Sequence, residues 1–220
     1  MTSSARRDLD TPIDGLLASS GSRVPYQANV LVRSFLLERP AGNVLVYNSP
    51  GITDAAAAIR ARGGATRLLI NHAHEAMYGP PELDVPVSVH ERDRADTARS
   101  LAVAETFDGR TLIDDDLEVI PTPGHTPGTA SYLWDNGTHR FLFTGDFLWI
   151  ENGAWKAVVL DDTLRSTYLD SLRLVCELDV DVLVPWGTTD EGLSFARTDP
   201  TDTRARIDEI VDRLQAGGNR

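Results

Sequence analysis

The sequence has one cysteine, no long apolar run and no excess of positive charge, and each of these absences excludes a class of protein. Cys176 has no intrachain partner, which excludes a disulfide-stapled domain and fits a reducing compartment. No stretch approaches the roughly 20 apolar residues of a membrane span. The formal net charge of −12 disfavours nucleic acid and anionic membranes as partners, because both bind basic surfaces. A small-molecule substrate fits these limits best.

The length and patterning predict one domain of the α/β class. With 220 residues, of which 41% are hydrophobic, the chain suits one sizeable domain or two small ones, and no boundary divides it. Residues 1–20 are polar and lack the apolar core of a secretory signal, so we expect a flexible N-terminal arm and a cytoplasmic protein. Residues 21–217 are expected to form a single domain. Strand-like runs and helix-like patterns alternate there in two series, which predicts two sheets flanked by helices.

Three histidines and one aspartate occupy the same kind of position in this pattern. His72 and His74 directly follow a short apolar strand predicted at residues 67–70. His125 and Asp146 also come directly after strand-like runs. Strand ends at one edge of a sheet cluster in space, and ligand sites of α/β folds form there. Three imidazoles and a carboxylate suit Zn²⁺, and also Fe²⁺ or Mn²⁺, so the pattern predicts a site for one divalent metal ion.

These four residues lie in three motifs that occur in a fixed order. The motifs are His-Ala-His at 72–74, Thr-Pro-Gly-His-Thr-Pro-Gly-Thr at 122–129 and Thr-Gly-Asp at 144–146. In this order they resemble the metallo-β-lactamase-fold superfamily, and the resemblance extends from residue 24 to the last predicted helix. It implies a four-layer αβ/βα sandwich. It also implies that the counterparts of His72, His74 and His125 hold a first metal and that the counterpart of Asp146 bridges to a second.

The chain departs from the family pattern at the ligands that belong to the second metal alone. Family members carry His-x-His-x-Asp-His in the first motif, and here the last two positions are Ala76 and Met77. A late Pro-Gly-His-Gly-like turn reads Pro-Trp-Gly-Thr at 185–188, with Trp186 and no histidine. Random substitution of metal ligands would affect the first metal site as well as the second. The chain therefore resembles a degenerate member, similar to one-metal hydrolases and glyoxalase II-like proteins, in which Met77 and Trp186 form an apolar wall.

The leading hypothesis is a metal-dependent hydrolase of a small ester, thioester, lactone or amide. A single zinc can lower the pKa of bound water to about 7. Because Ala76 replaces the aspartate that orients the water in relatives, another carboxylate must act as the general base. Asp146 is the best placed, ahead of Glu75, Asp190 and Glu191. Glu75 is expected at the surface or behind the metal ligands, and the last two in solvent.

Two other hypotheses stay open. Persulfide dioxygenases of this superfamily use one iron held by two histidines and an aspartate, which match His72, His125 and Asp146. The other hypothesis is a catalytically inactive domain without metal, which binds a ligand or partner in the cleft that serves as the active site in catalytic relatives. The residues expected to line the pocket are Met77, Tyr78, Trp149 and Trp186, of which Trp149 suits the core equally well.

Overall fold

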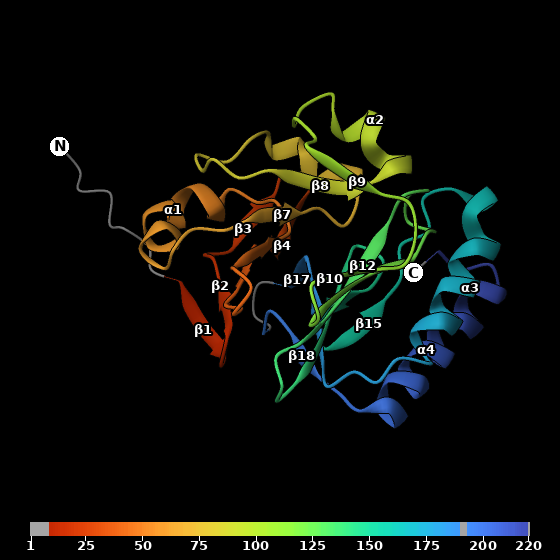
Figure 1. Ribbon diagram of the computed structural model, residues 1–220. Helices are drawn as coiled ribbons and strands as arrows, with labels where there is room; N and C mark the ends of the chain where they lie inside the picture. Colours follow the sequence, from red (N-terminus) through yellow and green to blue (C-terminus); the bar gives the residue numbers. More distant parts are fainter. Residues whose placement is uncertain (1–8, 190–192, 220) are drawn as a thin grey trace.

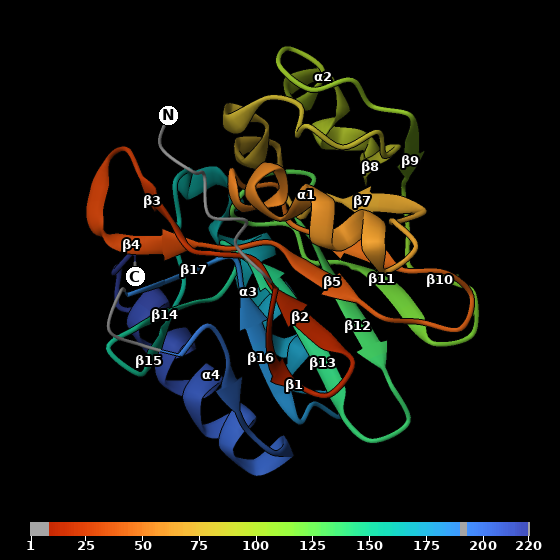
Figure 2. The same ribbon diagram turned by 90° about the vertical axis from the view of Figure 1, so that its left-hand side faces the viewer.

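Three β-sheets carry the described part of the chain, residues 9–189 and 193–219 of a computed structural model (Figure 1 and Figure 2). The first sheet has the strand order β1 (Asp10–Ile13), β2 (Leu16–Ala18), β5 (Phe35–Leu37), β6 (Val44–Val46), β7 (Arg67–Leu69), β8 (Val87–His90) and β9 (Glu105–Phe107). The second has the order β10 (Thr111–Ile113), β11 (Leu117–Pro121), β12 (Ala130–Asp135), β13 (Arg140–Gly145), β16 (Val182–Pro185) and β18 (Ala196–Arg197). The third has the order β15 (Ala154–Lys156), β14 (Trp149–Glu151), β17 (Gly187–Thr189), β4 (Gln27–Val32) and β3 (Ser22–Val24).

Helices cover the outer faces of the sheets. Figure 1 shows α1 (Gly51–Ala61) and the one-turn α2 (Arg94–Thr97) on one side of the molecule, and α3 (Arg165–Val175) and α4 (Pro200–Gln215) on the other. The sheets lie between them, which gives the predicted four-layer αβ/βα sandwich. A β-α-β unit is present, since β6 and β7 pair in parallel with α1 between them in sequence. None of the helices in the described ranges has the length and apolarity needed to cross a membrane.

The alternation of side chains along each strand explains the layers. In β6, Val44 and Val46 join the central hydrophobic core, whereas Leu45 packs with the residues under α1. In β13, Phe143 joins the same central core and Leu142 packs with α3 and α4. Successive side chains of a strand point to opposite faces, so each of these strands is buried on both faces.

The N-terminal prediction is wrong for part of its range. Residues 10–18 are not a flexible arm, because β1 and β2 pair antiparallel and β2 continues onto β5 at the edge of the first sheet. Leu16 and Leu17 are fully buried on opposite faces of that sheet, and their burial holds the segment in place. The domain therefore begins before residue 21, and residues 1–8 lie outside the described part of the chain.

Candidate metal centre

The four predicted metal ligands lie at the ends of three different strands. His72 follows β7 and precedes the 3₁₀ helix η1 (Ala73–Tyr78), which carries His74. His125 lies in the loop between β11 and β12, and Asp146 directly follows β13. His72 keeps an extended backbone, with φ −156° and ψ 162°, so the chain turns only after it. The structure brings all four side chains together.

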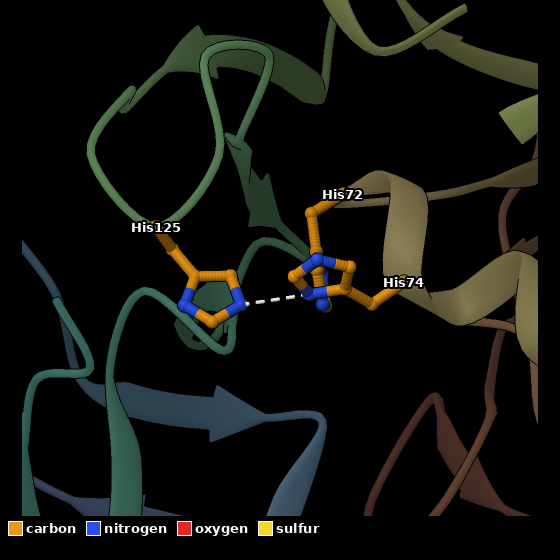
Figure 3. A group of neighbouring side chains, drawn as sticks. All are labelled: His72, His74 and His125. Atoms are coloured by element: carbon orange, nitrogen blue, oxygen red, sulfur yellow. Dashed lines mark hydrogen bonds between the residues drawn. The ribbon is translucent and has the colours of Figure 1, made fainter. Parts of the chain in front are cut away.

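The three imidazoles face one another across a small space (Figure 3). One ring nitrogen from each of the three histidines lies within 4.8 Å of the others. Nδ1 of His74 is 3.1 Å from Nε2 of His125. Oδ2 of Asp146 is 3.5 Å from Nε2 of His72 and 3.7 Å from Nε2 of His125. These separations leave room for one ion among the four side chains.

Hydrogen bonds on the far side of two rings fix which nitrogen faces this space. Nδ1 of His125 donates to the carbonyl of Val158 at 3.0 Å, which leaves Nε2 as the lone-pair atom. Nδ1 of His72 lies 3.2 Å from Oδ1 of Asn71 and 3.4 Å from Oε1 of Glu75, so its Nε2 is likewise free. That Nε2 is buried and has no hydrogen-bond partner within the described structure. Because a buried polar atom is rarely left unpaired, the donor set fits a metal ion.

The electrostatics of the cluster favour one positive charge at its centre. Burial lowers the pKa of His72, but the nearby carboxylates of Asp146 and Glu75 outweigh burial and raise that pKa to about 10. Burial and the charge on His72 lower the pKa of His125 to about 4. The carboxylates therefore stabilise a positive charge at His72, and this charge opposes a second one on His125.

Asp93 joins the two loops that carry the histidines. Its side chain is buried, with Oδ2 accepting from the backbone N–H of Ala73 at 2.8 Å and from the hydroxyl of Thr126 at 2.6 Å. Oδ1 accepts from the N–H of Gly128 at 2.7 Å. A Cβ atom at residue 128 would lie 2.5 Å from Oδ1, so this contact requires glycine. Asp93 was not predicted from the sequence, because it lies in a charged run that resembles an exposed helix.

A second set of contacts fixes Asp146. The N–H of Gly145 donates to the hydroxyl of Tyr47 at 2.8 Å, and that hydroxyl donates to the carbonyl of Val184 at 2.6 Å. Gly145 has φ +57°, and a Cβ there would overlap Oδ1 of Asn71. The chain can therefore turn from β13 into Asp146 at this point only with glycine.

Glu75 takes the second of the two places expected for it, behind the metal ligands. It is fully buried rather than at the surface, and Oε2 accepts from the N–H of Asn48 at 2.7 Å while Oε1 accepts from that of Asn71 at 2.8 Å. Its carboxylate orients the His72 side of the cluster and does not line the neighbouring cavity. Asp190 and Glu191, the other two candidate bases, lie outside the described residues.

A cavity of about 590 Å³ opens beside the cluster. Of the predicted pocket residues, Met77, Trp149 and Trp186 line it. Tyr78 is not part of the lining and packs edge-on against Trp186, with ring centroids 6.0 Å apart. Trp149 belongs to the central core as well. Ala76 is turned away into the core under α1, so this position contributes nothing to the cavity wall.

Trp186 lies against the histidine cluster. It belongs to the turn at residues 185–188, which lacks the histidine that family members carry. Its indole N–H donates to the carbonyl of Asn48 at 3.0 Å, and its ring meets that of His72 edge-on at 5.5 Å. The side chain is buried, and its position is therefore fixed both by packing and by a hydrogen bond.

Comparison with known proteins places the chain in a family. The model of the metallo-beta-lactamase superfamily matches residues 56–187, more than half of the chain. Among solved structures, GOB-18 from Elizabethkingia meningoseptica is 14% identical, with coverage of 99% of this chain and 93% of that chain and a TM-score of 0.61. BJP-1, a subclass B3 metallo-beta-lactamase of Bradyrhizobium japonicum, is also 14% identical, with coverage of 95% and 92% and a TM-score of 0.60. No curated protein matches the chain. The chain belongs to the metallo-beta-lactamase superfamily.

Proposed function

We propose that the protein is a hydrolase with a single divalent metal ion, for which Zn²⁺ is the best suited, held by His72, His74, His125 and Asp146. The observation that carries the proposal is the convergence of three imidazole nitrogens, one of which, the buried Nε2 of His72, has no hydrogen-bond partner among the described residues. The substrate would be a small ester, thioester, lactone or amide. Membership of the superfamily supports both the divalent metal and the hydrolytic chemistry.

The residues around the centre suit this reaction. When bound, the ion supplies a Lewis acid that lowers the pKa of water to about 7 and polarises a carbonyl. Asp146 is the carboxylate that lines the cavity, and its side chain is 20% exposed, so it can accept a proton from water there. Asn71, Glu75 and Val158 hold the rings of His72 and His125 in the orientation that a metal requires.

The proposal of one metal rests on what surrounds the centre. In the part of the chain that the structure describes, His72, His74 and His125 are the one group of three or more side chains that could hold an ion. Ala76 is packed into the core, and position 187 is a glycine beside the apolar Trp186. A second ion would have no ligands of its own in this region.

Metal content and hydrolysis, measured together, test the proposal. The protein, purified without a metal-affinity tag, is expected to carry one metal per chain by mass spectrometry and to hydrolyse members of a panel of neutral esters, thioesters, lactones and amides. Chelation and His125→Ala should each abolish hydrolysis while circular dichroism shows an intact fold. His139→Ala, at a hairpin turn outside the cluster, is the matched control and should keep full activity. Hydrolysis that survives chelation and His125→Ala would refute the proposal.

The same measurements separate the other two hypotheses. A dioxygenase site would use two imidazoles and Asp146, whereas His74 is here as close to the centre as the other two rings. Zinc without iron in anaerobically purified protein would exclude the dioxygenase. Protein with no stoichiometric metal would favour an inactive binding domain.

A further inference from the structure

The cavity beside the metal centre has a wall that the proposed reaction does not use. Val24, Val30 and Val32 line it from β3 and β4, and Trp149 and Trp186 line it from other parts of the fold. Its volume, about 590 Å³, is in the range of sites that enclose a whole small molecule. Water and a carbonyl group at the metal centre would fill a small part of this space.

Exposed apolar side chains gather at the same cavity. Five large hydrophobic side chains of the described chain are exposed, and three of them line it: Tyr26 (67%), Leu160 (59%) and Met77 (45%). Clustered apolar exposure marks binding surfaces, whereas isolated cases are ordinary. The concentration of these side chains at one cavity points to an apolar ligand there.

The charges of the lining point to a neutral ligand. Among the described residues that line the cavity there is no lysine or arginine, and Asp146 is the one carboxylate. The charged or titratable groups of the centre are His74, His125 and Asp146, and the other polar groups of the lining, on Gln27, Tyr26 and the two tryptophans, are uncharged. A carboxylate on the arm of a substrate would lose its hydration without gaining a cationic partner. The net charge of −12 adds a repulsive field for anions.

We infer that the cavity selects neutral carbonyl compounds that carry an apolar arm, an inference that rests on the proposed function for the carbonyl end and on the cavity alone for the arm. The carbonyl lies at the histidine cluster and the arm lies along the valines and tryptophans. Outside the cluster, no described side chain of the lining carries a charge, and this sets the preference for an uncharged arm.

Binding of linear amides to the full-length protein tests the inference, and the chelated protein gives this test without any catalytic step. The probes are acetamide, butanamide, hexanamide and octanamide. Binding is followed by tryptophan fluorescence, to which Trp149 and Trp186 of the lining contribute, in protein as purified and after chelation. Affinity should rise about fourfold per methylene until the cavity is filled, because each buried methylene contributes about 0.8 kcal/mol. Suberamate, an amide of the same length as octanamide with a carboxylate at the far end, should bind at least roughly tenfold more weakly.

A charge introduced at the cavity should reverse this preference. Gln27→Arg is expected to strengthen suberamate binding by about tenfold or more and to weaken octanamide binding, since it supplies the missing cation. Gln215→Arg makes the same substitution at an exposed position of α4 and should change neither affinity. Equal binding of acetamide and octanamide, or tighter binding of suberamate than octanamide to the unmodified protein, would overturn the inference.

The inference and the proposed function fail in different ways. If chain-length-dependent amide binding is found but the metal-loaded protein hydrolyses no ester, thioester, lactone or amide, the hydrolase proposal is wrong and the inference on the cavity stands. If hydrolysis is found and kcat/KM for alkyl esters does not depend on chain length, the hydrolase proposal stands and the inference is wrong.

Discussion

Asp93→Asn should weaken both the fold and the metal centre, because the buried carboxylate accepts three hydrogen bonds from the two histidine loops. Oδ1 accepts from Gly128, and Oδ2 accepts from Ala73 and Thr126. Asparagine keeps one acceptor oxygen, and its amide nitrogen then faces a backbone N–H in either orientation. The variant loses a charge-assisted bond, about 1.5–3 kcal/mol, and leaves a buried donor unpaired, about 1–3 kcal/mol. We expect a loss of about 3–5 kcal/mol in the free energy of unfolding.

Two assays separate the structural effect of this substitution from its effect on the centre. Urea unfolding followed by tryptophan fluorescence in the presence of a chelator gives the stability of the metal-free fold. Competition with a chromophoric chelator gives the affinity for Zn²⁺, which should fall about 10–100-fold because the histidine loops are no longer held in register. Asp96→Asn removes the same charge from a side chain that is 61% exposed and pairs with Arg99, and should change stability by less than about 0.5 kcal/mol. If the two variants behave alike, Asp93 does not position the loops.

Two further predictions concern the turn into Asp146 and the acid stability of the fold. Gly145→Ala should cost about 1–3 kcal/mol more than Gly63→Ala in thermal or urea unfolding, since both have positive φ and only the first meets another atom, Oδ1 of Asn71. Burial raises the pKa of Asp116, but hydrogen bonds and the charge of Arg39 outweigh it and hold the pKa below its ordinary value. The unmodified protein should therefore be more stable than Asp116→Asn by its full margin above about pH 4, and this margin should vanish as the pH falls further. Midpoints of urea unfolding at successive pH values would show this, and a margin independent of pH would contradict it.

Local patterns in the sequence are sufficient for the layers and for the histidine cluster. The apolar strand before His72, the proline-rich loop around His125 and the Thr-Gly-Asp end of β13 each carry their signal within a few residues. Strand ends then meet by topology, so the amino-acid sequence alone is enough to group the four side chains. The alternation of helical and strand-like patterns predicts two sheets flanked by helices, and the resemblance to the family implies the four-layer sandwich; the structure divides the described strands among three sheets.

The elements that the sequence does not predict depend on contacts between distant segments. Leu16 and Leu17 form a strand because β5 offers them an edge, and the short polar flanks around them give no such indication. Asp93 lies in the run Glu-Arg-Asp-Arg, which is typical of a solvated helix, and it is buried because Ala73 and Gly128 present N–H groups to it. For Glu75 the sequence leaves both the surface and a place behind the metal ligands open, and two backbone donors hold it in the buried place.

The apolar cavity and the proposed single metal are two consequences of one arrangement. In relatives of the usual pattern the late turn carries a ligand at the position of Gly187. Here a Cβ atom at that position would meet Cγ1 of Val30 at 3.3 Å and Cγ1 of Val32 at 3.9 Å, so a side chain there would press against the valine wall of the cavity. Trp186, held by Asn48, closes the same region against His72. Because Ala76 and Met77 also stand where relatives carry ligands of the second metal, substitution of Gly187 by histidine alone is not expected to restore a second ion.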